Sequence, residues 1–295
     1  MQQIADRYTI LRDGHVVSCG TVNGITISQL ISEMIGTDLE HMYRRSERSA
    51  GQIVLEAKDL RGTGGLKSAS FSLRSGEVLG IAGLVGSGRS AMIRAIFGLA
   101  PVCSGSIRVL EYSGYANPNV RWRQGTGFLS ENRKDEGIAL SMTLADNLIL
   151  PITRDLEIAG LLLPSKKEKA ARYWIEKLAI KCAGSSSKLS SLSGGNQQKV
   201  AFARLLHHQV DVLILDEPTR GIDVQTKRLI YTLIDHQSRQ GKAILMVSSY
   251  LPELLGICDR IAVMRRGYLG AFRQADQLSE RDLMLEIQAS GGAGQ

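Results

Sequence analysis

Short uninterrupted apolar runs, each ending at polar residues, predict the central strands of this chain. Residues 77–82, 212–215 and 243–247 are such runs. A strand that is covered on both faces is apolar throughout rather than at alternate positions, so these runs predict buried strands of a parallel sheet. Polar segments follow them directly, at residues 83–90, 216–217 and 248–249.

Helical periodicity marks several segments between and after these strands. Apolar residues spaced for one helix face predict helices that follow residue 90, cover about 165–178, begin near residue 193 and cover about 229–234. Residues 165–168 (Ser-Lys-Lys-Glu) fit a capping box at the start of the second helix. The apolar positions are Met92, Ile93, Ala95, Ile96, Ala171, Trp174, Ile175, Leu178, Val200, Phe202, Ala203, Leu205, Leu206, Leu229, Ile230, Leu233 and Ile234.

Shorter strands are predicted around a glycine-bearing turn in the first third of the chain. Residues 53–57 and 69–73 flank this turn, and residues 106–110 and 126–129 predict two further strands. The last of these leads into Ser130-Glu131-Asn132-Arg133-Lys134, a polar turn.

The first candidate for chemistry is the glycine-rich segment 83–90, Gly-Leu-Val-Gly-Ser-Gly-Arg-Ser. It lies between a predicted buried strand and a predicted helix, which is the context that a phosphate-binding P-loop requires. Arg89 stands where the P-loop pattern has lysine. Arginine keeps the positive charge, but its planar head is bulkier than an ammonium group.

Two further segments accompany the P-loop pattern. Asp216 and Glu217 end a buried strand, and their carboxylates suit magnesium and a hydrolytic water. Residues 192–199 read Leu-Ser-Gly-Gly-Asn-Gln-Gln-Lys and open a helix. The Ser193 hydroxyl is placed to cap this helix, and the glycines let backbone amides approach an anion. Taken alone, Ser-Gly-Gly would read as an ordinary N-cap.

In the order P-loop, Ser-Gly-Gly segment and acidic strand, the three segments resemble the nucleotide-binding domain of an ATP-binding cassette (ABC) protein. The sequences of residues 192–199 and 216–223 are similar to those of the ATPase subunit of bacterial simple-sugar importers of the ribose, galactose and xylose type. The resemblance covers most of residues 53–287. It implies an α/β P-loop NTPase fold with a mostly parallel core sheet, a small antiparallel β subdomain and an α-helical subdomain at about 131–207.

The resemblance also implies roles for individual residues, with ATP and Mg²⁺ as cofactors. ATP would lie between two cassettes, with the P-loop of one and the signature segment (residues 192–199) of the other closing on it. Ser90 and Asp216 would hold Mg²⁺, Glu217 would orient or deprotonate the attacking water, and Asp223 would lie across the interface. The remaining nucleotide-binding positions would be Gly83, Val85, Gly86, Ser87, Gly88, Arg89 and Glu131, with Ser193, Gly194, Gly195 and Gln197 serving the opposite site.

Three positions depart from the general cassette pattern. Arg89 replaces the P-loop lysine, Glu131 the glutamine that senses the γ-phosphate region, and Ser249 the histidine that binds the γ-phosphate. The alternative for Glu131 is an exposed charged turn. Many cassettes stack an aromatic residue on adenine, but none occurs between Tyr43 and Phe71. We therefore expect a poorly hydrolysing site at this P-loop, in which Ser249 acts weakly beside the catalytic Glu217, and slow turnover for the chain alone.

A short internal sequence repeat suggests where the domains of this chain begin and end. Residues 4–7 (Ile-Ala-Asp-Arg) recur as residues 257–260 (Ile-Cys-Asp-Arg), an offset of 257 − 4 = 253. Chance similarity is the alternative to tandem domains. On the tandem interpretation, residues 1–36 are the C-terminal remnant of a first cassette, with a strand at 8–11, a turn at 13–14 and a helix from about 28. The linker then covers 37–52, the second cassette 53–290 and a flexible tail 291–295.

The amino-acid composition limits the kinds of partner and ligand that we expect for this chain. Lys and Arg number 36 against 29 Asp and Glu, giving a net charge of +7, but the charges are spread along the chain. Aromatic residues make up only 5%, without basic–aromatic interleaving, so we expect no nucleic-acid partner. The four cysteines show no metal or disulfide spacing. No apolar run approaches the roughly 20 residues that span a bilayer.

These observations favour the ATPase of an importer for a simple sugar or a related small polar solute. Its partners would be a second cassette, transmembrane permease subunits and, indirectly, an extracytoplasmic solute-binding protein, and it would lie at the cytoplasmic face of the membrane. The alternative is a degenerate nucleotide-binding module, regulatory or structural, with little or no ATPase activity. Cassettes of DNA repair or translation factors carry long coiled-coil insertions, and no heptad run occurs here. A P-loop kinase would leave the signature segment unexplained.

Overall fold

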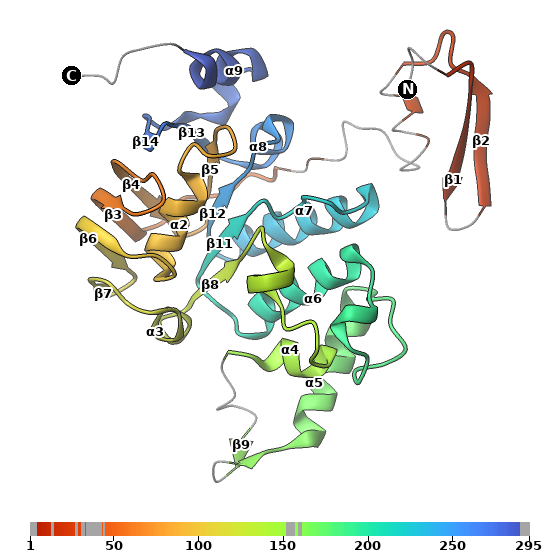
Figure 1. Cartoon of the computed structure of the whole chain (residues 1–295), viewed down its shortest axis with the longest axis horizontal. Helices are drawn as coiled ribbons and strands as arrows, with labels where there is room; N and C mark the ends of the chain where they lie inside the picture. The colour runs from red at the N-terminus through yellow and green to blue at the C-terminus, as the bar shows by residue number, and fades with distance from the viewer. Residues whose placement is uncertain are drawn as a thin grey trace.

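The computed structural model describes residues 5–12, 15–26, 29–30, 33, 43, 45–151, 157–158 and 161–289, of which 12, 157–158 and 161–162 are described as backbone only. Figure 1 shows a main body that carries the core sheet, a helical lobe below it and an N-terminal hairpin to one side. None of the helices in the described residues is both long and apolar enough to cross a membrane.

The core sheet has seven strands in the order β14-β13-β5-β12-β11-β8, with β15 paired to β13. Every residue of β5, β11 and β12 is buried, as the continuous apolar runs predicted. Five strands run parallel: β5 (Val78–Ala82), β8 (Thr126–Leu129), β11 (Val212–Asp216), β12 (Ala243–Val247) and β13 (Arg260–Arg265). The short strands β14 (Tyr268–Leu269) and β15 (Arg273–Gln274) are antiparallel to β13.

Helices pack against this sheet and extend its apolar core. Helix α2 contacts β11, α7 contacts β12, α8 contacts β5 and α9 contacts β13. Because these contacts bury the apolar faces of both partners, the strand ends that carry polar residues are held rigidly. The helices are α2 (Arg89–Phe97), α3 (Pro118–Arg123), α7 (Val224–Arg239), α8 (Leu251–Ile257) and α9 (Glu280–Gln288), with a 3₁₀ turn at Ala275–Gln277.

A second, antiparallel sheet packs beside the core, in the order β4-β3-β6-β7. The predicted strands 53–57 and 69–73 are confirmed, although the first continues to residue 62. The strands are β3 (Ile53–Gly62), β4 (Ala69–Arg74), β6 (Val102–Val109) and β7 (Tyr112–Ser113). The fold is therefore the predicted α/β P-loop arrangement of a mostly parallel sheet and a small antiparallel one.

The helical lobe is interrupted by turns and a short strand pair within the α-helical subdomain that was expected at about 131–207. A π-helical turn at Arg133–Gly137 leads to α4 (Leu144–Ile149), and backbone pairing of β9 (Glu157–Ile158) with β10 (Leu161–Leu162) follows. The lobe continues with α5 (Pro164–Lys177), a 3₁₀ turn at Leu189–Ser191 and α6 (Gly194–His207).

The predicted capping box at residues 165–168 is wrong. Helix α5 starts one residue earlier, at Pro164, and its N-cap Leu163 makes no side-chain cap hydrogen bond. Proline favours the first helical position, so Ser165 lies inside the helix. The predicted apolar face of this helix is confirmed, with Ala171 and Trp174 buried in the core.

The N-terminal hairpin pairs β1 (Arg7–Arg12) with β2 (His15–Thr21) and has its own small core of Tyr8, Ile10, Val22 and Leu30. Its register repeats that of β13 with β14. Leu11 pairs with Val16 as Met264 pairs with Leu269, and 264 − 11 = 269 − 16 = 253. The sequence offset is thus also a structural one.

Some predictions fall on residues outside the described ones: the turn at 13–14, the start of a helix at about 28, most of the linker up to residue 44, and the tail at 291–295. The later part of the predicted linker is held against α7 and the end of α8. Ser46 bonds to Asp235 of α7 through both its amide and its hydroxyl, and Arg48 donates to Ser238 and to the carbonyl of Ile257.

Candidate functional site

The loop that joins β5 to α2 has the backbone geometry of a phosphate cradle. A Cβ at Gly83 would lie 2.4 Å from the carbonyl oxygen of Met264, and Gly88, the N-cap of α2, has φ +104°. Both positions therefore require glycine. Nothing lies within 4 Å of a Cβ built on Gly86, and the neighbouring Val85 side chain is 83% exposed, so the loop faces open space.

Arg89 lies at the start of α2, and its side chain is buried. Its Nη2 is 3.3 Å from Oε1 of Glu217, and each of the two side chains is 6% exposed. Burial lowers the pKa of Arg89, whereas the charges of Glu217 and Asp216 oppose that shift. Arg89 therefore holds the carboxylate that the sequence assigned to catalysis.

Two buried donors of the loop have no hydrogen-bond partner among the described residues: Nη1 of Arg89 and Oγ of Ser87. An unpaired buried donor is costly, so such groups call for a ligand that accepts hydrogen bonds. Phosphate oxygens have this chemistry, and the open cradle of the loop leads to the same place. These residues fit the phosphates of ATP.

Ser90 and Asp216 lie together, as the magnesium prediction requires. The hydroxyl of Ser90 donates to Oδ1 of Asp216 at 3.3 Å. Burial raises the pKa of Asp216 to about 6, although the bond from Ser90 opposes the shift. A hydroxyl and one carboxylate suit Mg²⁺ that also binds phosphate oxygens and water. No cluster of three His, Cys, Asp or Glu side chains within the described ranges could hold a metal by itself.

Glu217 follows Asp216 in a strained conformation, with φ +47°. Non-glycine residues at positive φ are uncommon and concentrate at functional sites. Besides Arg89, the carboxylate accepts the Ser249 backbone N–H at 2.7 Å and the Ser248 hydroxyl at 3.4 Å. The Ser249 backbone therefore contacts the carboxylate, while the residue itself is exposed.

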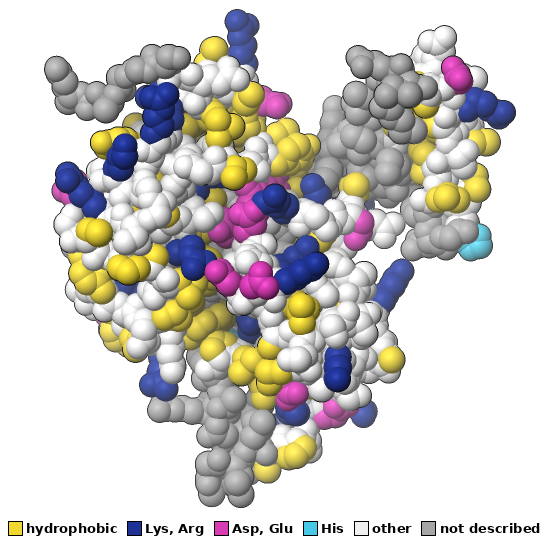
Figure 2. Space-filling view, in the orientation of Figure 1, with side chains coloured by type: hydrophobic (Ala, Val, Ile, Leu, Met, Phe, Trp, Pro, Cys, Tyr) yellow, Lys and Arg dark blue, Asp and Glu magenta, His cyan; other side chains and the backbone are white. Residues whose placement is uncertain are grey.

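Glu131 also reaches this region, but its carboxylate forms an ion pair with Arg220. Ser90, Glu131, Asp216 and Arg220 line one groove of about 790 Å³. The structure thus brings three predicted residues together and adds Arg220, to which the sequence analysis gave no role. Figure 2 shows acidic and basic side chains gathered near the middle of the face that it draws.

The signature segment begins α6 as predicted, with Ser193 as the N-cap. The predicted cap bond from its hydroxyl is wrong, because this oxygen accepts the Asn196 side-chain amide at 2.9 Å instead. The Gln197 side chain turns inward and donates to the carbonyls of Leu189 and Leu192 at 3.0 and 3.1 Å. These bonds hold the amide nitrogen of Gln197 within the chain, and the expected contact of this residue with a nucleotide stays a prediction.

Both glycines of the signature segment lie close to other parts of the site. Gly194 accepts a hydrogen bond from Nη1 of Arg133 at 2.7 Å. A Cβ at Gly195 would lie 2.9 Å from Oδ2 of Asp223. Asp223 is the N-cap of α7, and both its oxygens accept hydrogen bonds from Thr226. The predicted interface carboxylate therefore also caps a helix.

Sequence reasoning missed the side chain that ties the signature segment to the acidic strand. Gln198 is buried, and its amide donates to the carbonyl of Pro218 at 2.5 Å. Its neighbour Gln197 has the same chemistry, and only the helix phase determines which amide faces Pro218. The sequence signal available was the repeated glutamine itself.

The P-loop and the signature segment face different grooves. Ser193, Gly195, Asn196 and Asp223 line a groove of about 660 Å³. None of these four residues lines the groove at Ser90, and Ser90 does not line theirs. The signature segment and Ser90 of the P-loop thus line separate grooves of this chain.

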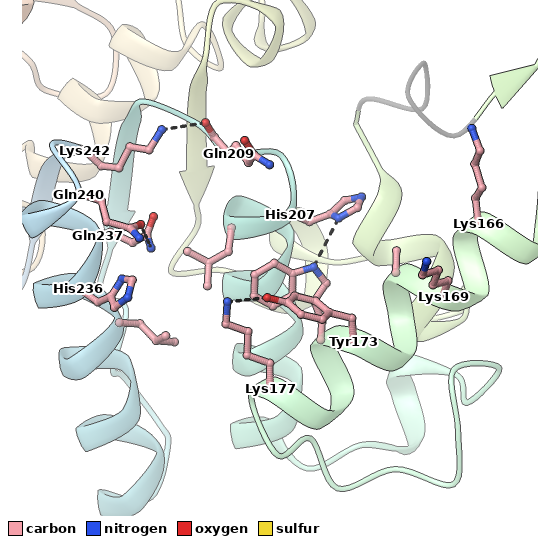
Figure 3. Close-up of a pocket in the computed structure, with 14 residues that line it drawn as sticks. Lys166, Lys169, Tyr173, Lys177, His207, Gln209, His236, Gln237, Gln240 and Lys242 are labelled. Atoms are coloured by element: carbon pink, nitrogen blue, oxygen red, sulfur yellow. Dashed lines mark hydrogen bonds between the residues drawn. The ribbon is translucent and has the colours of Figure 1, made fainter.

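A third groove, of about 740 Å³, contains none of the predicted site residues (Figure 3). It lies between α5, the end of α6 and α7, with Tyr173, Trp174 and Lys177 on one wall. Lys177 donates to the Tyr173 hydroxyl at 2.8 Å, and Trp174 donates to Nδ1 of His207 at 3.4 Å. These two bonds engage polar groups of the groove with one another.

The chain is similar in sequence to known ATP-binding proteins of ABC transporters. The family model described as "ABC transporter" matches residues 66–220. A ribose import ATP-binding protein of Lactococcus lactis subsp. cremoris is 40% identical over 96% of this chain and 57% of its own length. Its counterpart in Bacillus subtilis is 39% identical over 98% of this chain and 58% of its own length. The chain thus spans less than three fifths of the curated relatives that it matches.

Solved structures agree on the fold. The ATP-binding subunit of an ABC transporter superposes with a TM-score of 0.65 at 24% identity, covering 80% of this chain and all of that subunit. A dimeric bacterial ABC transporter cassette gives a TM-score of 0.64 at 20% identity, covering 75% of this chain and 98% of its own. The described architecture is therefore shared with ATP-binding cassettes of known structure.

Proposed function

Because this chain belongs to the ABC transporter family, we propose that it is the second ATP-binding cassette of an importer for ribose or a related simple sugar. The relatives named above are ribose import ATP-binding proteins. The proposal extends their printed role to this chain, with ATP hydrolysis coupled to transport.

The observation that carries the proposal is the meeting of four side chains from two separate strand ends. Arg89 and Ser90 follow β5, whereas Asp216 and Glu217 end and follow β11, and the two pairs contact each other at 3.3 Å in both cases. The unpaired donors on Ser87 and Arg89 point to phosphate as the ligand of this meeting place. Phosphoryl transfer requires such positioning and charge stabilisation.

In this proposal each residue has a specific task. The backbone of residues 83–90 and the Arg89 guanidinium bind the phosphates, and Ser90 and Asp216 hold the magnesium ion. A magnesium ion held there would neutralise negative charge on the phosphates. Glu217 orients or deprotonates the attacking water after its Oε1 is released by Arg89. Ser249 contributes its backbone N–H, which holds the Glu217 carboxylate.

We further propose that a second cassette completes the nucleotide sites. The P-loop and signature grooves of this chain share none of the residues named above, so a partner surface is needed to close each one. The equal register of the β1–β2 and β13–β14 hairpins supports residues 1–36 as the end of a first cassette, residues 37–52 as a linker and residues 53–290 as the second cassette. Ser193, Gly194 and Gly195 would then serve the P-loop of the other cassette.

The remaining partners follow from the importer role. We propose permease subunits that cross the membrane, a solute-binding protein on the outer side, and a peripheral position of this chain at the cytoplasmic face. We propose that the π-helical turn at Arg133–Gly137, which follows Glu131, contacts the permease. The Arg89–Glu217 ion pair supports slow hydrolysis at this P-loop, because ATP must first displace Glu217.

Co-purification and ATP hydrolysis test this function. The tagged chain, expressed in its source cell and isolated from detergent-solubilised membranes, is expected to retain a polytopic permease. Purified wild-type protein is expected to hydrolyse ATP slowly, and Glu217→Gln is expected to reduce this rate by about two orders of magnitude or more. A matched Glu111→Gln variant, on the exposed turn before β7, serves as control. Hydrolysis that is unchanged in Glu217→Gln would refute the assignment of this site.

A further inference from the structure

Glu253 of α8 is a buried carboxyl group that the reaction described above does not use. It is only 1% exposed. Within the described part of the chain, no lysine or arginine forms an ion pair with it. The titratable groups that act on it include Glu217, Tyr231, Tyr43 and Cys258, none of which is a cation. An unpaired charge in such a place is costly.

Three hydroxyl groups surround this carboxyl group, each from a different element. Thr219, in the loop after β11, donates to Oε2 at 2.6 Å, and Tyr231 of α7 donates to the same oxygen at 2.8 Å. The hydroxyl of Ser248, at the end of β12, contacts Oε1. Oε2 therefore has two donors, whereas Oε1 has the single contact with Ser248.

Ser248 also faces the catalytic carboxylate, and its single proton cannot serve both carboxyl groups. Its Oγ lies 3.4 Å from Oε2 of Glu217 and accepts the backbone N–H of Tyr250 at 3.0 Å. If Glu253 were ionised, Ser248 could donate to only one of the two carboxylates. The other would face a lone pair of the hydroxyl.

A proton on Oε1 of Glu253 resolves this conflict. The neutral acid then donates to Ser248 Oγ, which accepts it together with the Tyr250 N–H. The Ser248 proton is thereby free to point at Glu217, and every donor and acceptor of the group is satisfied. Hydrogen positions follow from completing such a network, so this assignment comes from the arrangement of oxygens and nitrogens.

We propose that Glu253 is a positioning residue, held as a neutral carboxylic acid, whose donation to Ser248 directs the Ser248 hydroxyl toward the Glu217 carboxylate. This inference rests on the proposed role of Glu217 in ATP hydrolysis. Burial raises the pKa of Glu253, and the nearby charge of Glu217 acts in the same direction, although the three hydroxyl contacts oppose the shift.

The consequence is a fixed orientation of the catalytic carboxylate. Ser248 holds Oε2 of Glu217, while the Ser249 backbone N–H holds Oε1 at 2.7 Å. Through Thr219, Glu253 also holds the turn that begins at Glu217, which has positive φ. When Arg89 is drawn to phosphate, these contacts remain and keep Glu217 in place for the attacking water.

Two substitutions of Glu253 distinguish between a neutral carboxylic acid and an ionised carboxylate at this position. In Glu253→Gln the amide nitrogen can donate to Ser248, and the amide oxygen can accept from Thr219 and Tyr231, so it reproduces the neutral acid. Glu253→Met fills similar space but makes none of these bonds. Each variant is compared with wild type in single-turnover hydrolysis of ATP at saturating Mg²⁺, which detects slow rates, and in equilibrium ATP binding.

We expect Glu253→Gln to hydrolyse ATP within about threefold of the wild-type rate, and Glu253→Met to lose about tenfold or more in rate with little change in ATP affinity. If Glu253→Gln loses as much rate as Glu253→Met, Glu253 acts as a carboxylate and the proposal is overturned. Equal rates in all three proteins would overturn it as well.

Infrared spectroscopy gives a readout that does not depend on hydrolysis and needs only the folded Glu253→Gln variant. The difference spectrum of wild type minus Glu253→Gln at pH 7 is expected to contain the C=O stretch of a protonated carboxylic acid. A carboxylate band in its place would refute the neutral state. Wild-type protein without hydrolysis would overturn the proposed ATPase function, while the infrared band would still decide the state of Glu253.

Discussion

The buried ion pair of Arg89 and Glu217 makes a quantitative prediction about the nucleotide-free protein. At 3.3 Å, two unit charges attract by about 5 kcal/mol at an effective dielectric constant of 20. Both side chains are 6% exposed, so the loss of hydration offsets much of this attraction. The pair therefore adds little net stability, but each charge depends on the other.

Arg89→Met, Glu217→Gln and the double variant test this dependence. Arg89→Met leaves the Glu217 carboxylate buried without its cation, and we expect it to lower the free energy of unfolding by about 3–5 kcal/mol. Glu217→Gln leaves the guanidinium in the converse position. The double variant removes both charges, so its loss is expected to be smaller than the sum of the single losses by about 2–3 kcal/mol.

Urea unfolding, followed by far-ultraviolet circular dichroism and by fluorescence of the buried Trp122 and Trp174, measures these energies. Arg94 and Glu136 provide a matched control, because they also form an ion pair but are 32% and 33% exposed. The corresponding cycle with Arg94→Met and Glu136→Gln is expected to give about 1 kcal/mol or less.

The same unfolding measurements can be repeated with bound ATP. Because phosphate oxygens would take Arg89 away from Glu217, the coupling between these two residues is expected to shrink at saturating MgATP. Additive losses in the nucleotide-free protein, within about 0.5 kcal/mol, would refute the reasoning that the two side chains depend on each other.

Three further predictions concern the framework of the site. Burial lowers the pKa of His208 from 6.5 to about 4. The neutral ring therefore contributes its full stability above pH 6.5, and the free energy of unfolding falls as the pH is lowered, by about 3 kcal/mol near pH 4. Urea unfolding of wild type and His208→Gln from pH 7.5 to 4.5 measures this loss. Gly195→Ala brings a Cβ within 2.9 Å of Asp223 and is expected to cost about 1–3 kcal/mol in thermal unfolding, whereas Gly194→Ala, with no such contact inside 3.6 Å, is the control. Asn147→Ala removes three buried hydrogen bonds to backbone groups, and a loss of about 2–4 kcal/mol in urea unfolding is expected; a loss below 1 kcal/mol would contradict this account.

The parts of the fold that the sequence predicted best are those governed by local patterns. The strands β8 and β12 have the predicted bounds, and α6 begins directly after Ser193. A buried parallel strand must be apolar along its whole length, and a glycine-rich loop before a helix has few alternatives. The α/β class and the place of the P-loop therefore follow from the order of residues alone.

Local patterns also produced the errors. The capping box at residues 165–168 satisfied a sequence rule, but Pro164 began the helix one residue earlier. The Ser193 hydroxyl had the right position for a cap, yet Asn196 competes for it. Short polar side chains can bond to several near neighbours, and their choice depends on the packing of the surrounding chain.

What only the tertiary structure decided is how distant polar groups are paired. Arg89 and Glu217 are 128 positions apart, and Glu253 finds Thr219 across 34 positions. The sequence by itself identified the cation of Arg89, the carboxylates of Asp216 and Glu217, and the signature segment as candidates for the site. Their pairing depends on which strand ends lie side by side in the sheet, and periodicity carries no information about that order. Nor does it reveal that Glu253 is buried against Ser248, or that no described lysine or arginine forms an ion pair with it, which are the physical grounds for the neutral state that we propose.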